Sequence, residues 1–199
     1  LTGAGSVRAN GGRGGDGNSG GGGGGGGRIA IRAVSSGNPD LLAFSASGGV
    51  GAYPNSNGGS GTIYTRNPLQ TSSFNLKVGG SVAAGTNTLV GGADLSIDTM
   101  TVLNSQVIFD TGSVVNVGTM SVTGTNALTA STLTFTGSGL GMAQGSTLTW
   151  TASQVTVGAA GKVAIGSNAV VTLTFGRIDL PGSSGLELGS GSRLRVAGS

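Results

Sequence analysis

Short runs of alternating apolar and polar residues fill the chain from position 88 onward, and they recur at close, nearly even intervals. Strict alternation predicts β-strands with one buried and one exposed face. The residues between the runs are mostly Gly, Asn, Ser and Ala, which tolerate the backbone conformations of corners and turns. Because no stretch carries the apolar i, i+3, i+4 spacing and the caps of a helix, the sequence predicts an all-β protein with negligible helix.

The strands that this pattern predicts are all short. They are expected at residues 94–97, 100–103, 106–109, 114–117, 120–123, 132–136, 147–150, 154–157, 162–165, 169–175, 177–180, 186–188 and 194–196. All-β chains with strands this short form sandwiches, barrels or solenoids.

One stretch of this region occurs twice. Residues 106–118 match residues 154–166 at an offset of 48 positions, with apolar residues over apolar residues, such as Val107 over Val155. Self-similarity at a fixed period predicts a stacked array, and we interpret this period as two coils of about 24 residues each. The pattern therefore favours a parallel β-solenoid (β-helix), and an antiparallel sandwich remains the alternative.

Residues 1–70 form a glycine-rich region with an internal repeat of its own. Each copy reads strand, small residues, glycine loop and a second strand that ends in Arg, and the second strands are expected at residues 28–34 and 62–66. Residues 20–27 are eight consecutive glycines. Two interpretations of this run stay open. It forms polyglycine segments with a three-residue turn, which stack closely because they lack side chains, or it forms an irregular loop held on the surface.

We predict two domains, a glycine-rich β region at residues 1–70 and a β-solenoid repeat region at residues 71–199. The junction is expected at residues 67–86, where Pro68 interrupts a strand ladder. The chain begins with Leu1 rather than Met, and its last residues keep the strand–turn rhythm. We therefore expect a segment of a longer protein.

The composition excludes several kinds of catalysis and metal binding. The 199 residues include 43 Gly, and only 9% are charged and 4% aromatic, whereas soluble domains average about 7% Gly and about 25% charged residues. Cysteine and histidine are absent, so no disulfide, thiolate nucleophile, histidine base or Cys/His metal site can form. We expect neither an enzyme nor a cofactor.

The net charge of +3 comes from scattered arginines among residues 1–70. Scattered charges are a poor basis for nucleic-acid binding, so no nucleic-acid partner is expected. No apolar run approaches the length of about 18 residues that a transmembrane helix needs. The sequence therefore predicts no transmembrane segment.

A calcium motif is matched weakly near the N-terminus. Residues 11–16 fit the first six positions of the nonapeptide G-G-x-G-x-D-x-U-x. The apolar position U is Asn18, and this motif binds calcium only in tandem copies. Asp16 is thus a weak calcium candidate, and no metal site is predicted.

Carboxylates are few in the repeat region: Asp94, Asp98, Asp110, Asp179 and Glu187. Acid–base chemistry on a polysaccharide needs two carboxyl groups that face one bond. Asp98 and Asp110 stand at predicted turns, Asp110 at the first position of a β-turn. Because no carboxylate cluster with an adjacent Lys or Arg can be assembled, no catalytic residue is predicted.

Threonines in T-x-T patterns are the most suggestive polar feature. The candidate exposed face comprises Thr132, Thr134, Thr147, Thr149, Thr172 and Thr174. Regular ranks of such threonines on a flat solenoid face would resemble ice-binding proteins. Threonine is also simply a good strand former on an exposed surface, so both interpretations stay open.

The few aromatic residues fall into two groups. Phe109, Phe135, Trp150 and Phe175 sit at inward positions of predicted strands and are expected in the core. Tyr53 and Tyr64 belong to the glycine-rich region and are expected to pack on its surface.

Residues 111–118 and 145–150 resemble the strand–turn phrases of autotransporter passengers and filamentous-haemagglutinin-type adhesins. Residues 26–32 and 59–66 are similar to Gly-rich repeats of very large bacterial surface proteins. These resemblances imply a right-handed parallel β-helix that is exported and displayed outside a bacterial cell. They transfer no catalytic residues.

Together these observations favour a non-enzymatic extracellular structural protein: a β-solenoid segment of a surface adhesin, a stalk or a self-assembling filament. The expected partners are further copies of the chain or a cell-surface polysaccharide. The alternatives are an ice-binding solenoid that uses the T-x-T threonines and a polysaccharide-binding or lyase-type β-helix.

Overall fold

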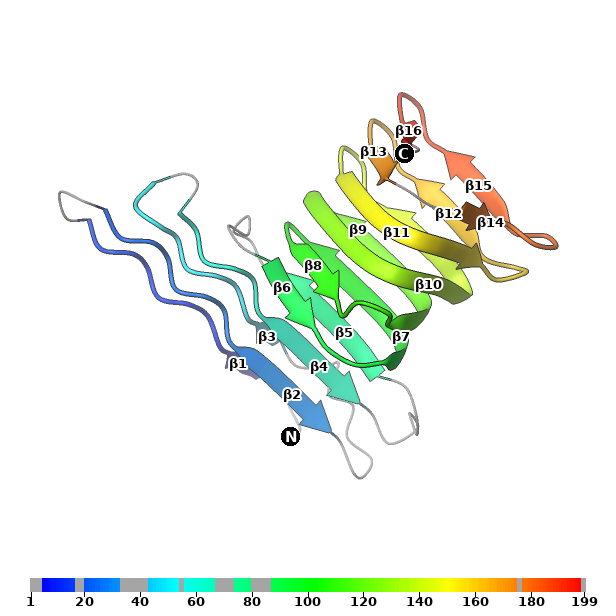
Figure 1. Cartoon of the computed structure of the whole chain (residues 1–199). Coiled ribbons are helices and arrows are strands. Elements are labelled where there is room, and N and C mark those ends of the chain that lie inside the picture. Colours follow the sequence, from blue (N-terminus) through cyan, green and yellow to red (C-terminus); the bar gives the residue numbers. More distant parts are fainter. Residues whose placement is uncertain are drawn as a thin grey trace. The chain divides into compact units, whose positions relative to one another are not determined.

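The computed structural model describes residues 5–16, 20–32, 43–53, 56–66, 74–79, 87–174 and 177–197. Every regular element in these ranges is a β-strand (Figure 1), which confirms the predicted lack of helix. None of the described residues belongs to a helix of the length and apolarity that crossing a membrane requires. The chain divides into two compact units, Leu1–Thr88 with Asn104–Gln106 and Leu89–Leu103 with Val107–Ser199.

Unit 1 contains two copies of one plan, which we call hairpin 1 and hairpin 2. Hairpin 1 comprises β1 (Ser6–Arg8), segment A (residues 9–15), segment B (residues 20–27) and β2 (Arg28–Arg32). Hairpin 2 comprises β3 (Ala43–Ser45), segment C (residues 46–52), segment D (residues 56–61) and β4 (Thr62–Arg66). β1 pairs with β3 and β2 pairs with β4, both in parallel. Equivalent strands of the two hairpins are therefore direct neighbours, and β5 (Phe74–Gly79) pairs antiparallel with β4.

Backbone hydrogen bonds join the polyglycine segments of each hairpin at every third residue. In hairpin 1 they are Gly21 N to Gly15 O, Gly24 N to Gly12 O and Gly27 N to Ala9 O, and in hairpin 2 they are Gly58 N to Gly49 O and Gly61 N to Ala46 O. A three-residue period is that of the polyproline II helix, in which every third residue points the same way. Residues 20–27 thus bond to segment A with a three-residue period.

Absence of side chains is what lets these segments approach. A Cβ built on Gly23 would lie 2.0 Å from Gly49 O, and one built on Gly58 would lie 2.0 Å from Gly24 O. No real Cβ tolerates such contacts. At Gly25, by contrast, a Cβ would meet no atom within 4 Å. Glycine is therefore a packing requirement at some positions of the segments and not at others.

The apolar core of unit 1 is small and lies at the strands. Ile29, Ala46 and Ile63 are buried there, with Phe44 packed against them. The side chain of Tyr64 packs on the Phe74 ring, with ring centroids 4.7 Å apart. Cohesion of this unit thus combines a limited core with a large backbone hydrogen-bond network.

Unit 2 is a parallel β-solenoid of about five turns (Figure 1). Its strands are β7 (Asp94–Leu103), β8 (Gln106–Phe109), β9 (Val114–Thr123), β10 (Thr125–Met142), β11 (Thr147–Val157), β12 (Lys162–Ile165), β13 (Val170–Thr174), β14 (Arg177–Asp179), β15 (Gly185–Leu188) and β16 (Arg193–Ala197), and β6 (Asn87–Val90) begins at the end of unit 1. The strand pairs described within this solenoid are parallel. The predicted fold class, an all-β chain with a parallel β-solenoid, is confirmed.

Three faces run along the solenoid, because β7, β9, β10 and β11 continue around corners. Face 1 carries residues 94–97, 114–117, 132–135, 154–157 and 177–179. Face 2 carries residues 99–103, 119–122, 139–142, 162–165 and 185–188. Face 3 carries residues 125–130, 147–151, 170–174 and 193–197. β8 also lies on face 3, because it pairs with β10 and β9 pairs only with residues 132–142 of that strand.

Inward side chains of successive coils stack into columns and form the core of unit 2. Val117, Phe135 and Val157 occupy one such column and are completely buried. The ring of Trp150 meets the ring of Phe135 edge-on, with centroids 6.0 Å apart. Phe109, Phe135 and Trp150 are all buried as predicted, and Phe175 lies outside the described residues. Each fully buried side chain of this size contributes about 1.5–3 kcal/mol to folding.

The interpretation of the 48-residue repeat as two coils is wrong. Successive partners along face 1 are Asp94, Val114, Thr132, Gln154 and Arg177, so every coil is shorter than expected. Gln154 lies two coils after Val114, and this spacing is shorter than the period of the repeat. Gln106 begins β8 on face 3, whereas Gln154 lies on face 1, so the matching copies occupy different faces.

Several strand boundaries also differ from the prediction. Three of the four strands that turn corners, β7, β9 and β11, were predicted as two separate pieces, because a small residue at a corner looks like the end of a strand in the sequence. Of β10, only residues 132–136 were predicted. Residues 125–130 form a strand on face 3 that the pattern did not predict. The pattern correctly predicted β4, β8, β12 and the short strands near the C-terminus.

Candidate functional site

Face 3 gathers threonines into neighbouring rows. Thr147, Thr149 and Thr151 lie side by side along β11. Their partners on the adjacent strands include Thr125, Thr129, Thr172 and Thr174, through the pairs Thr125–Thr147, Thr129–Thr151, Thr149–Thr172 and Thr151–Thr174. Neighbouring strands lie about 4.8 Å apart and alternate residues about 6.8 Å apart. The result is a regular array of hydroxyl and methyl groups.

Four of the six predicted site threonines belong to this array: Thr147, Thr149, Thr172 and Thr174. The other two, Thr132 and Thr134, lie on face 1 beside Val114 and Asn116. The prediction therefore combined residues from two faces. Thr125 and Thr129 were missed, because residues 125–130 were not recognised as a strand.

The array has defined borders. Ala127 and Val170 occupy two of its positions, and the last coil continues the same rows with Arg193 and Arg195. Threonine hydroxyls donate and accept hydrogen bonds but do not titrate in the ordinary pH range. The array can thus order water or bind a polar surface, and it offers no acid–base group of its own.

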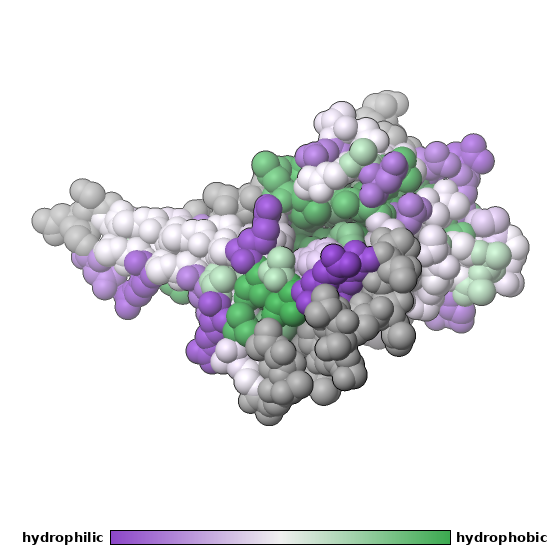
Figure 2. Space-filling model, turned by 90° about the horizontal axis from the view of Figure 1, so that it is seen from below, coloured by the Kyte–Doolittle hydropathy of each residue, from purple (hydrophilic) through white to green (hydrophobic). Residues whose placement is uncertain are grey.

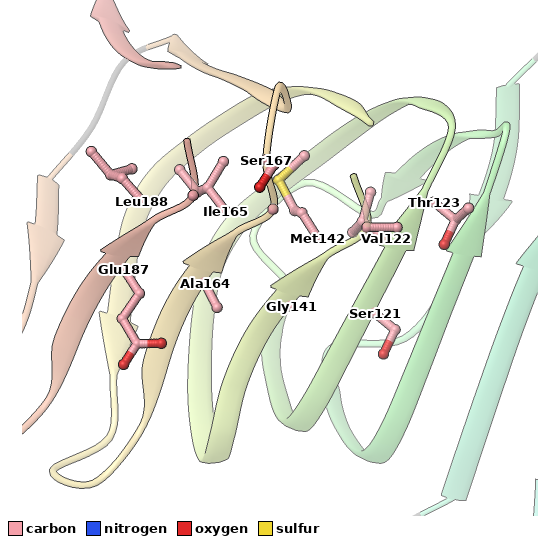
Figure 3. A pocket seen from close by; sticks show the side chains of 13 residues that line it. Ser121, Val122, Thr123, Gly141, Met142, Ala164, Ile165, Ser167, Glu187 and Leu188 are labelled. Atoms are coloured by element: carbon pink, nitrogen blue, oxygen red, sulfur yellow. The ribbon is translucent and has the colours of Figure 1, made fainter. Parts of the chain in front are cut away.

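A shallow hollow lies at the corner that follows face 2 (Figure 3). It has a volume of about 610 Å³ and is lined by residues 121–123, 141–143, 164–167 and 187–189. The lining contains no aromatic ring. The small residues Gly141, Ala164 and Gly166 belong to its lining. Glu187, which also lines the hollow, is paired with Lys162.

The carboxylates do not converge. Asp110 accepts a hydrogen bond from Gly92 N at 3.1 Å, and its carbonyl accepts from Ser113 N at 3.0 Å. The predicted turn at this residue is confirmed. Asp179 contacts Arg177 and Gln154. Within the described ranges no three His, Cys, Asp or Glu side chains are grouped so as to hold a metal ion.

The calcium candidate Asp16 is engaged by a neighbour. Arg13 donates two hydrogen bonds from its guanidinium to the Asp16 carboxylate, at 2.9 and 3.1 Å. Both side chains are exposed. The carboxylate thus has a cationic partner in this structure.

The last described coil of the solenoid exposes side chains at inward positions. Leu186 and Leu188 are 41% and 54% exposed, whereas their partners one coil earlier, Val163 and Ile165, are 4% and 2% exposed. Val196 is 64% exposed, whereas its partner Leu173 is 4% exposed. These side chains point in the same direction as those of the buried columns, but no described coil covers them.

Comparison of this chain with protein-family models, with curated proteins and with solved structures returns no significant match. The functional argument therefore rests on the surfaces described above.

Proposed function

We propose that this chain is a non-enzymatic structural segment of an extracellular bacterial surface protein, a stalk or adhesin shaft whose solenoid continues by end-to-end stacking of coils. The exposed inward side chains of the last coil carry this proposal. Leu186, Leu188 and Val196 keep the register of the buried columns beneath them. A further coil of the same kind would bury them as the earlier coils bury theirs, and in the purified chain a second copy is the source of such a coil.

Two other features support a structural role. The backbone ladder of a parallel solenoid runs along its axis, so each added coil extends one continuous hydrogen-bonded rod. Open ends of such a ladder expose unpaired backbone groups and favour pairing with another chain. The resemblance of residues 111–118 to adhesin solenoids is the reason for placing the protein at a bacterial surface.

Electron microscopy of the purified chain over a range of concentrations tests this proposal. We expect rods that lengthen with concentration, and a Leu188→Glu/Val196→Glu variant that stays short because two charges would be buried at the junction. Val114→Glu is the matched control, because Val114 is exposed on the side of the solenoid. Short monodisperse rods of the unaltered chain at every concentration would contradict end-to-end stacking, and turnover in a polysaccharide-lyase screen would contradict the non-enzymatic role.

The threonine array favours ice binding as a second candidate function. Seven threonines on three adjacent strands of face 3 repeat at regular spacings, which suits the periodic surface of a crystal better than a single small ligand. Thermal hysteresis of a dilute solution is the measurement. We expect Thr149→Val/Thr172→Val to abolish hysteresis and Thr134→Val on face 1 to retain it. The absence of hysteresis in the unaltered chain would rule out this candidate.

A further inference from the structure

Hairpin 1 of unit 1 packs on hairpin 2 with one face and leaves its opposite face uncovered by any described residue. We call the latter the free face of hairpin 1. The strand β2 pairs with β4 and is the last strand of its sheet on that side. Figure 2 shows the surface of the glycine segments nearly white, because backbone rather than strongly polar or apolar side chains covers it.

Six backbone groups of segments C and D bond to the backbone of segments A and B. The carbonyls of Ser47, Val50, Ser56 and Gly59 accept from Gly11, Gly14, Gly23 and Gly26, and the N–H groups of Gly49 and Ala52 donate to Gly24 and Gly21. The donor–acceptor distances are 2.7 to 3.0 Å. This contact therefore consists mainly of a backbone ladder, and the side chain of Asn10 adds to it by accepting from Ser45 Oγ at 2.7 Å and from Ser47 N at 3.0 Å.

The free face of hairpin 1 repeats these six groups. Gly12 corresponds to Gly49, and Gly24 corresponds to Gly58, because the bond from Gly24 N to Gly12 O has its counterpart in the bond from Gly58 N to Gly49 O. The equivalent groups in hairpin 1 are the carbonyls of Asn10, Arg13, Gly22 and Gly25 and the N–H groups of Gly12 and Gly15. None of the six has a hydrogen-bond partner within the described part of the chain. Exposed rows of unpaired backbone groups are templates for another chain.

The glycines of the free face match as well. In hairpin 2, a Cβ on Gly49, Gly58 or Gly61 would lie 1.9 to 2.0 Å from a carbonyl of hairpin 1. The equivalent residues Gly12, Gly24 and Gly27 are all exposed. A Cβ on Gly12 would meet no atom within 4 Å. Glycine costs about 0.5–1 kcal/mol more than Ala to order, and packing among the described residues does not explain its presence at Gly12.

We propose that the free face of hairpin 1 is a docking surface for a further polyglycine hairpin, supplied by another glycine-rich chain and stacked in parallel as hairpin 1 stacks on hairpin 2. Hairpin 1 donates to hairpin 2 through the N–H groups of Gly11, Gly14, Gly23 and Gly26. The docked hairpin must donate N–H groups to the free face at the equivalent positions. Hairpin 2 of a second copy does not qualify. Its Gly51 N–H, the equivalent of the Gly14 donor, already donates to Asn57 Oδ1.

Amide hydrogen exchange of the full chain tests the proposal, with a synthetic peptide of residues 5–32 as the probe. In the chain alone we expect the amides of Gly12 and Gly15 to exchange freely while those of Gly49 and Ala52 are protected. Added peptide should slow exchange at Gly12 and Gly15 by about tenfold or more, because these amides then enter a ladder.

Two alanine variants separate docking from folding. Gly12→Ala should leave the melting temperature unchanged but abolish the added protection of Gly15, because the equivalent Cβ on Gly49 would lie 1.9 Å from a carbonyl. Gly15→Ala is the matched control. Ala52 already occupies the equivalent position, and a Cβ on Gly15 meets no atom within 4 Å, so this variant should respond to the peptide at Gly12 as the unaltered chain does.

A tandem chain, with residues 5–42 duplicated ahead of Gly5, repeats the test without requiring the peptide to fold alone. The original Gly12 and Gly15 should then be protected like Gly49, and Gly12→Ala at the original site should lower the melting temperature only in the tandem chain. Free exchange at Gly12 and Gly15 in both experiments would overturn the proposal, as would equal effects of Gly12→Ala and Gly15→Ala. Neither result bears on stacking at Leu188 and Val196, so this inference and the proposed function fail separately.

Discussion

Unit 1 and unit 2 both stack repeated elements, but opposite features hold their repeats together. In unit 2 the inward side chains fill the interior, with Phe135 and Val117 completely buried. In unit 1 the polyglycine segments meet through backbone atoms, and Gly58 and Gly23 leave no space for even one methyl group. The comparison shows that buried side chains stabilise unit 2, whereas the absence of side chains allows the segments of unit 1 to pack. The two units should therefore respond oppositely to a change in side-chain size.

The largest effect is expected for Phe135→Ala in the solenoid. This change removes a completely buried ring that contacts Trp150 and leaves a cavity, which costs about 3–5 kcal/mol. Urea unfolding followed by the fluorescence of Trp150, the single tryptophan of the chain, measures it. Thr134→Ala, the outward neighbour, is the control and should cost less than about 0.5 kcal/mol.

Gly58→Ala should have the next largest effect, although it adds one methyl group. Its Cβ would lie 2.0 Å from Gly24 O, and overpacking of this kind costs about 1–3 kcal/mol. Faster amide exchange at Gly24 and Gly49 measures the loss within unit 1. Gly25→Ala meets no atom within 4 Å and should be neutral or stabilising by about 0.4–1 kcal/mol. Equal losses in both variants would refute the distinction between required and unrequired glycines.

A smaller effect is expected at a corner of the solenoid, where the Asp110 side chain accepts a hydrogen bond from the backbone of Gly92. Asp110→Ala removes the acceptor of the Gly92 N–H and should cost about 0.5–1.5 kcal/mol. The midpoint of urea unfolding reports it. Asp94→Ala, on the exposed side of face 1, is the comparison and should shift that midpoint less.

The smallest effect is expected for Glu187→Gln. The ion pair with Lys162 lies on the surface, with both side chains about half exposed, and such pairs contribute about 0–1 kcal/mol. The small loss should disappear in high salt, which screens exposed charges. A loss that persisted at high salt would show that packing at this corner, rather than charge, is responsible.

Alternation along the strands was sufficient to predict an all-β fold and the buried aromatic residues, because inward phase determines burial wherever a further coil covers the strand. It was insufficient for the coil length. Residues 107–109 on face 3 (Val-Ile-Phe) and residues 155–157 on face 1 (Val-Thr-Val) both carry apolar residues at the first and third positions. If a stretch is assigned to the neighbouring face, its apolar residues at these positions still point inward. The sequence therefore cannot distinguish faces that bury the same kinds of side chain.

The candidate surfaces depend on that missing information. The threonines of face 3 become neighbours only when the coil length is known, which is why Thr132 and Thr134 were included and Thr125 and Thr129 were not. The glycine run presents the same difficulty in a stronger form. Its residues are identical, so nothing in the sequence marks the register that places Gly23 against Gly49 and leaves Gly25 open.

The backbone bonding of the polyglycine segments also affects how the protein responds to temperature. Apolar burial weakens on cooling, because its hydration carries a large heat capacity. The core of unit 2 depends on this term, whereas segments A to D bury peptide groups and few apolar atoms. Per residue, unit 1 should therefore unfold with a smaller heat-capacity change. On cooling, its free energy of unfolding should fall less than that of the solenoid core.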